Sequence, residues 1–147
     1  MGRKAIEVGL TGRTVAANIA RFRGLRGLTL AELSARMTEV GRPMTGNTLS
    51  AIENRSRRAD VDDLVAIAAA LSVSPAALLM PLTDEVDDTV RVSGGAAAGG
   101  SVWDWLTADS PLDTSIVAAE RDEFAIEAWR REQVPPWAYR LRAVDRG

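Results

Sequence analysis

The apolar residues in the first half of the chain recur at helical spacing in five successive stretches. Val15, Ile19 and Phe22 lie at positions i, i+4 and i+7, so they share one face of a helix that is expected to begin near residue 14. Similar stretches follow at 30–39, 46–54, 61–71 and 74–79. Gly and Pro residues separate several of them, so the pattern predicts an all-α bundle of five short helices.

Capping signals mark the starts of the second and third helices. Thr29 followed by Glu32 is a capping box, in which each side chain satisfies a backbone N–H at the start of the helix. Thr45 is expected to cap the third helix. Apolar residues on either side of each cap lie at hydrophobic-staple spacing, Leu28 with Leu33 and Met44 with Leu49. Two short helices with defined entry angles make residues 29–54 a candidate helix-turn-helix.

The third helix is polar on the face opposite its apolar anchors, Leu49 and Ile52. The segment Gly41-Arg42-Pro43 interrupts the helical pattern before it. A short helix with apolar anchors and a polar outer face is how helix-turn-helix proteins present a helix to the major groove of DNA. The sequence therefore favours nucleic-acid binding at this helix.

Composition changes outside the bundle. Residues 1–12 are expected to form a loose N-terminal arm. Residues 82–101 contain an acidic run followed by SGGAAAGGS, which predicts a flexible linker. Residues 102–147 contain all four Trp and the single Tyr, and are expected to supply a dimer surface or to contact a protein partner or effector.

Two local patterns are visible within this aromatic region. Trp103 and Trp105, two positions apart, favour a short extended or turn segment, and residues 114–132 are expected to form a helix with a weak apolar face. The aromatic side chains are more often a packed cluster or a dimer contact than a ligand cage. The four residues expected to contact a partner or effector are Trp103, Trp105, Trp129 and Trp137.

Charge is divided unevenly along the chain. Residues 1–58 hold 11 Lys and Arg against 4 Asp and Glu, a net charge of +7, whereas residues 59–147 hold 7 against 16, a net charge of −9. A basic first part and an acidic remainder favour a polyanion-binding face combined with a segment that is kept away from the polyanion.

The chain contains no Cys and no His, so thiolate chemistry, thiolate zinc sites and His-based acid–base catalysis are excluded. The carboxylates after residue 100 have no Gly-rich phosphate loop beside them, so no enzyme, cofactor or metal site is expected. No signal peptide is visible, and no apolar run approaches the roughly 18–20 residues of a membrane-spanning helix. We expect a cytoplasmic, nucleoid-associated protein.

Three runs, IARFRGLRGLTLAEL, TGNTLSAIEN and DVDDLVAIAAALSVSPAALL, together resemble the phage-repressor-like helix-turn-helix family of the XRE or Cro/C1 type. The resemblance covers residues 13–81. It implies a five-helix, lambda-repressor-like bundle that binds double-stranded DNA with its third helix, and a role as a transcriptional regulator.

The resemblance also implies which residues meet DNA. Asn47 is the leading base-reading candidate, because Asn can bond adenine through two atoms, and the arginines around the third helix are placed to contact phosphates. The full set of expected DNA-binding residues is Arg42, Thr45, Gly46, Asn47, Thr48, Ser50, Asn54, Arg55, Arg57 and Arg58. Arg23 and Glu53 match an ion pair between helices 1 and 3 of the family.

Three features depart from the family pattern. Gly46 and Leu30 stand where many members carry Gln, so one base contact and one phosphate contact are expected to be missing. The turn over residues 40–44 is longer than the tight turn of the family, so the sequence does not fix the angle between the second and third helices.

Two functions from different classes fit these features. The first is a sequence-specific regulator, most simply a repressor that binds a two-fold operator as a homodimer. The alternative is an antitoxin or adaptor whose aromatic C-terminal segment binds a partner protein, with DNA binding used for autoregulation. Without the resemblance, the polar face of the third helix is equally compatible with a merely solvated surface.

Overall fold

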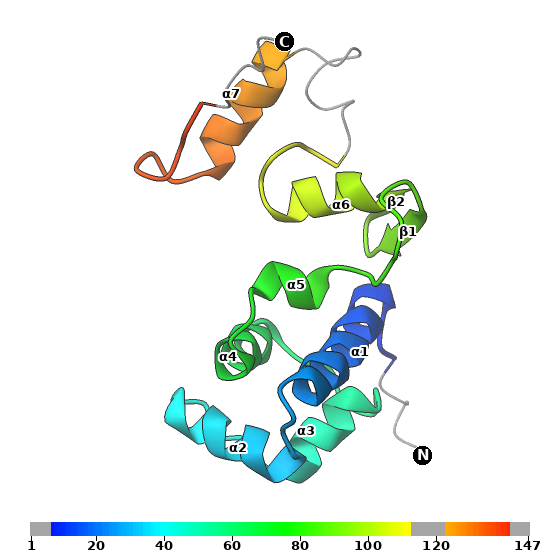
Figure 1. Ribbon diagram of the computed structural model, residues 1–147, viewed down its shortest axis with the longest axis vertical. Helices are drawn as coiled ribbons and strands as arrows, with labels where there is room; N and C mark the ends of the chain where they lie inside the picture. Colours follow the sequence, from blue (N-terminus) through cyan, green and yellow to red (C-terminus); the bar gives the residue numbers. More distant parts are fainter. Residues whose placement is uncertain (1–6, 113–122, 142–147) are drawn as a thin grey trace, which may run out of the picture.

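The computed structural model describes residues 7–112 and 123–141, and its first part is the expected helical bundle (Figure 1). The helices are α1 (Leu10–Leu25), α2 (Leu30–Glu39), α3 (Gly46–Glu53), α4 (Val61–Leu71) and α5 (Pro75–Leu79). Residues from all five helices share one buried cluster, in which Ile19, Leu33 and Leu49 are completely buried. The predicted all-α bundle is confirmed, with a small sheet in addition.

The predicted caps are present. The Thr29 hydroxyl accepts a hydrogen bond from the Glu32 N–H at 3.1 Å, and the Glu32 carboxylate accepts one from the Thr29 N–H at 3.3 Å. Thr45 caps α3 through the Thr48 N–H at 3.1 Å. All four staple residues are buried in the core: Leu28, Leu33, Met44 and Leu49. Local signals and tertiary burial therefore agree across the helix-turn-helix.

The N-terminal boundary differs from the prediction of a loose arm over residues 1–12. Helix α1 already begins at Leu10, and Val8 is buried before it. Arg58 donates from Nε to the Glu7 carbonyl at 2.8 Å, which holds this segment against the loop after α3. Tertiary contacts thus order residues 7–12, and the remainder of the predicted arm lies outside the described residues.

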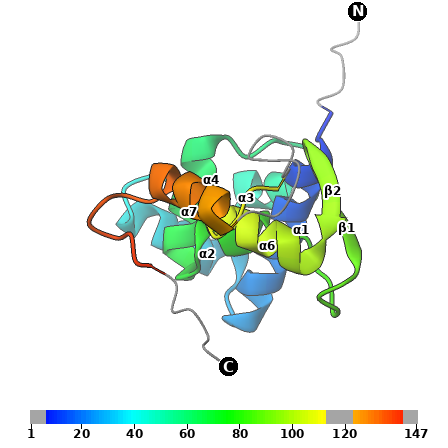
Figure 2. The same cartoon turned by 90° about the horizontal axis from the view of Figure 1, so that it is seen from above.

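The prediction of a flexible linker over residues 82–101 is wrong. This segment contains an antiparallel hairpin of β1 (Thr89–Val92) and β2 (Gly95–Ala98), followed directly by α6 (Gly99–Leu106). Val90 and Val92 point inward and pack with Val102 of α6 in a second, smaller core. The hairpin lies beside the start of α1, as Figure 2 shows, where the Ser93 N–H donates to the Thr11 hydroxyl at 2.9 Å.

The small residues of this segment serve close packing. A Cβ atom added to Gly99 would lie 2.9 Å from Cγ2 of Thr83, and one added to Gly100 would lie 2.7 Å from Cγ2 of Val86. Both distances are shorter than real Cβ contacts, so a side chain at either glycine would require Thr83 or Val86 to shift.

The aromatic region contains two helices, α6 and α7 (Glu123–Gln133). The expected extended or turn segment at Trp103 and Trp105 is helical instead. Trp105 packs partly buried on the second core, whereas Trp103 is 41 % exposed. Helix α7 covers part of the predicted helix over 114–132, whose earlier residues 114–122 lie outside the described part. Helix α7 lies at the end of the molecule opposite to α2 and α3 (Figure 1).

Candidate nucleic-acid interface

The turn between α2 and α3 is longer than a tight family turn, but it is closed by hydrogen bonds. After the last residue of α2, the Gly41 N–H donates to the Thr38 carbonyl at 3.1 Å and the Arg42 N–H donates to the Met37 carbonyl at 3.0 Å. This is the Schellman arrangement, and Gly41 supplies the positive φ of 86° that it requires. The Ser34 hydroxyl then donates to the Met44 carbonyl at 2.6 Å. The turn therefore delivers the chain to α3 in one defined direction.

Helix α3 presents a polar face outward. Leu49 and Ile52 are buried in the core, while Thr45 and Asn47 are exposed. Gly46, Thr48 and Ser50 are half-buried. Because Thr45 and Thr48 are engaged in the cap, Asn47 is the exposed side chain of this helix start that is best suited to reach a base edge.

The predicted ion pair between α1 and α3 is present. Arg23 Nε lies 2.9 Å from Glu53 Oε1, and Arg23 Nη1 donates to the Leu28 carbonyl at 2.9 Å. Glu53 is the only acidic residue of α3. Its pairing leaves the outer face of the helix without an uncompensated negative charge, which favours approach to a polyanion.

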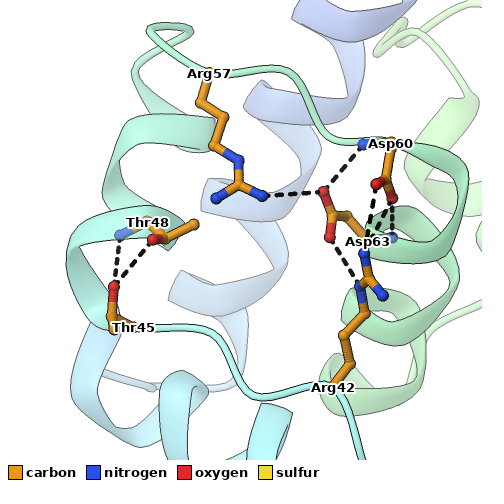
Figure 3. A network of polar contacts seen from close by, with 6 residues as sticks. All are labelled: Arg42, Thr45, Thr48, Arg57, Asp60 and Asp63. Atoms are coloured by element: carbon orange, nitrogen blue, oxygen red, sulfur yellow. Dashed lines mark hydrogen bonds and ion pairs between the residues drawn. The ribbon is translucent and has the colours of Figure 1, made fainter.

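Three of the arginines expected at phosphates make contacts within the protein, and Figure 3 shows two of them, Arg42 and Arg57. Arg42 Nε bonds Asp63 Oδ1 at 2.9 Å, and Arg57 Nη2 lies 3.7 Å from Asp63 Oδ2. Arg58 bonds the Glu7 carbonyl. The hydrogen bond to Asp63 raises the pKa of Arg42 above its ordinary value.

The loop after α3 contains one residue that stabilises the loop itself, Asn54, and two arginines whose charges no carboxylate of the described residues neutralises, Arg55 and Arg58. Asn54 holds the loop, since its side-chain oxygen accepts from the Ser56 N–H at 3.1 Å and from the Ser56 hydroxyl at 2.7 Å. Arg55 follows in the left-handed region with φ of 67° and is exposed, and no polar partner of its side chain is found within residues 7–112 and 123–141. Arg55 and Arg58 thus keep charges that no described carboxylate neutralises.

Asp63 is the residue of this region that sequence reasoning missed. Its side chain is 1 % exposed, although three acidic residues at a helix start usually indicate a solvated surface. The spacing of Asp60 and Asp63 is that of a capping box, and the structure contains it: the Asp63 N–H donates to Asp60 Oδ1 at 2.7 Å, and the Asp60 N–H to Asp63 Oδ2 at 3.1 Å. The spacing could have revealed the cap, but not the burial.

The two positions that depart from the family pattern lie next to each other. A Cβ atom at Gly46 would be 3.8 Å from the backbone carbon and the Cβ of Leu30. Leu30 packs partly buried against the core at the start of α2. A small residue at the start of α3 therefore fits an apolar residue at the start of α2.

The four Trp residues are divided between α6, α7 and the segment after α7. Trp103 and Trp105 belong to α6, while Trp129 is half-buried on α7 and Trp137 is 86 % exposed after it.

Among residues 7–112 and 123–141, no helix has the length and apolar character needed to span a membrane, and no group of His, Cys, Asp and Glu is arranged to hold a metal ion.

Comparison with known families supports this interpretation of the bundle. Residues 19–78 match the helix-turn-helix family model, and this segment therefore forms a helix-turn-helix domain of the phage-repressor-like type. The protein is accordingly a DNA-binding transcriptional regulator in the general sense. No match was found among curated proteins or among solved structures.

Proposed function

We propose that this protein is a sequence-specific regulator, most simply a repressor, that binds a two-fold operator as a homodimer with α3 in the major groove. The observation that carries the proposal is the outer face of α3. This face begins at a capped helix start, displays Asn47, and contains no unpaired carboxylate, while Leu49 and Ile52 fix the helix to the core.

The side chains have separate roles in this proposal. Asn47 reads an adenine through its amide, and Thr45, Thr48 and Ser50 add contacts of low discrimination. Arg55 and Arg58 bind phosphates, because their charges are not shared with a carboxylate in the described residues. Such contacts supply affinity and salt dependence, whereas the choice of sequence comes from base contacts.

A homodimer is proposed because one recognition helix reads only a few base pairs, and two half-sites raise specificity. The aromatic region, residues 102–147, supplies the dimer surface. Its large apolar side chains Trp137 and Leu141 are 86 % and 72 % exposed. We place the protein in the cytoplasm, where its DNA would be.

The alternative is a partner-binding protein that uses DNA binding for autoregulation. Its specific support is the same apolar exposure at the end of the molecule away from α3, where Leu141 is 72 % and Trp137 is 86 % exposed. A partner protein could cover this surface as well as a second copy could.

Binding to genomic DNA fragments, including the region upstream of the gene, tests the proposal at two salt concentrations. A discrete protected site that persists at the higher salt is expected. A chain ending at residue 112, which keeps the hairpin and α6, should bind half-sites but lose cooperative binding to the full site. Weak binding that disappears with salt everywhere would instead favour the partner-binding function.

Two single substitutions separate base reading from phosphate binding. Asn47→Ala should cost about 1–3 kcal/mol of specific binding and relax one base position. Arg55→Ala should weaken all DNA about equally and reduce the salt slope by about one. If both variants behave alike, the assignment of these roles is wrong.

A further inference from the structure

The two segments that flank α3 meet at a single carboxylate of α4. Arg42 comes from the turn before α3 and Arg57 from the loop after it, and both guanidinium groups point at Asp63 (Figure 3). The recognition helix is thus attached to the rest of the bundle at both ends through one side chain.

Both oxygens of the Asp63 carboxylate accept hydrogen bonds. Oδ1 accepts from Arg42 Nε at 2.9 Å, and Oδ2 accepts from the Asp60 N–H at 3.1 Å, with the side chain 1 % exposed. A buried carboxylate is costly unless it is paired and hydrogen-bonded, so removing one partner is unfavourable. This requirement fixes where Arg42 can lie.

The two arginines are held unequally. Arg42 makes a short hydrogen bond to Asp63 and also lies 3.4 Å from Asp60 Oδ2. Arg57 is 3.7 Å from Asp63, which is beyond hydrogen-bond distance, so its donors stay available. Between them lies an open polar hollow at the start of α3, lined by Arg42, Pro43, Thr45, Thr48, Arg57 and Asp63.

We propose that Asp63 is a positioning residue for DNA recognition. It holds Arg42 as a structural link that sets the direction of α3, and it keeps Arg57 beside the hollow, where a backbone phosphate of the DNA binds. This inference rests on the proposed function. A phosphate bound there would set the register of α3 on the duplex, so that Asn47 meets one particular base.

A pair of neighbouring substitutions tests this role against a simple charge effect. Asp62→Asn and Asp63→Asn remove the same negative charge from the first turn of α4, and only Asp62 is exposed. If charge alone mattered, both variants would bind every DNA more tightly, because repulsion of phosphates falls. Positioning predicts different outcomes for the two variants: Asp63→Asn lowers the ratio of specific to unrelated affinity about tenfold, while Asp62→Asn leaves this ratio unchanged.

Arg42→Lys provides a second test that keeps the charge. A lysine ammonium cannot reproduce the fork of donors that Arg42 directs at Asp63 and Asp60. The ratio of specific to unrelated affinity should fall as in Asp63→Asn, and the double variant should be no worse than either single one. Circular dichroism would show whether each variant is folded, and titration with excess DNA would give the fraction of each variant that can bind DNA.

Each outcome decides whether Asp63 positions α3 for DNA recognition. Equal behaviour of Asp62→Asn and Asp63→Asn overturns the proposal, as does an unchanged affinity ratio in Arg42→Lys. If Asp63→Asn does not fold, Arg42→Lys alone decides, and if neither folds, the contact serves folding and not recognition. Absence of any specific site for the unmodified protein would instead refute the proposed function itself.

Discussion

The bundle of residues 10–81 and the hairpin unit of residues 82–112 use the same small residues for opposite purposes. In the bundle, Gly41 ends a helix with a positive φ, the use that its place after an apolar stripe indicates. In the hairpin unit, Gly99 and Gly100 lie within a helix and permit close packing. A run of glycine and alanine therefore indicates flexibility only where nothing packs against it.

The two regions also differ in how their order arises. Helices α1 to α4 each bury two or more residues and α5 buries Leu78, and α2, α3, α4 and α5 also have side-chain caps, so local sequence and tertiary structure agree. The hairpin unit buries only Val90, Val92 and Val102 among its large apolar residues, together with partly buried neighbours. Its stability depends on contact with the bundle, because an isolated two-stranded hairpin is marginal in water.

The largest expected effect is loss of the bundle core. Leu49→Ala removes a completely buried side chain that anchors α3, and should lower the free energy of unfolding by about 2–5 kcal/mol. Specific DNA binding should fall in parallel. Chemical denaturation followed by circular dichroism measures the change, with Leu25→Ala as control, because Leu25 is 68 % exposed. An equal effect of both variants would contradict the assigned core.

The junction between the two regions depends on Asn18, which is 2 % exposed. Its amide donates to the carbonyls of Ala77, Leu78 and Met80 at 3.3, 2.9 and 2.8 Å, at the point where the chain leaves α5 for the hairpin unit. Asn18→Leu keeps a similar size but leaves these carbonyls without their donor, so we expect a loss of about 1–3 kcal/mol.

Tryptophan fluorescence gives a separate readout for this junction, because all four Trp lie beyond residue 100. In the unmodified protein, fluorescence and circular dichroism should report one transition. In Asn18→Leu, the fluorescence transition should come first, as the hairpin unit loosens from the bundle. Coincident transitions in the variant would show that Asn18 stabilises the bundle alone.

A smaller effect is expected at Gly99, where the linker and packing interpretations make opposite predictions. Gly99→Ala places a Cβ 2.9 Å from Thr83, whose hydroxyl bonds Asp88 at 2.8 Å and the Glu85 carbonyl at 3.1 Å and so cannot easily turn away. We expect a loss of about 1–2 kcal/mol in thermal unfolding. Gly95→Ala is the matched control, because its Cβ would lie at an ordinary 3.5 Å from Leu112.

The smallest effect is expected at Gly46. Gly46→Ala adds a Cβ at 3.8 Å from Leu30, which is ordinary contact, and should stabilise α3 by up to about 1 kcal/mol. Thermal unfolding measures this gain. Unchanged DNA affinity would show that DNA does not need the bare backbone at this position, whereas weaker binding would indicate close approach of a base there.

The sequence alone determined the bundle, because local capping signals and apolar spacing predict its helices. The capping box at Thr29, the cap at Thr45 and the staples around them each involve residues three to five positions apart, and the structure contains all of them. The ion pair of Arg23 with Glu53 was available only through the family resemblance, which supplied a contact across 30 positions.

Only the tertiary structure decided what the arginines and glycines do. Whether Arg42 faces solvent or Asp63 depends on a carboxylate 21 positions away, and whether Gly99 is flexible depends on Thr83 packing against it. Spacing along the chain carries no information on such contacts, because they form only after the helices have docked. The sequence therefore showed that the first part of the chain is basic. It did not show which arginines contact groups within the protein and which remain available at the surface.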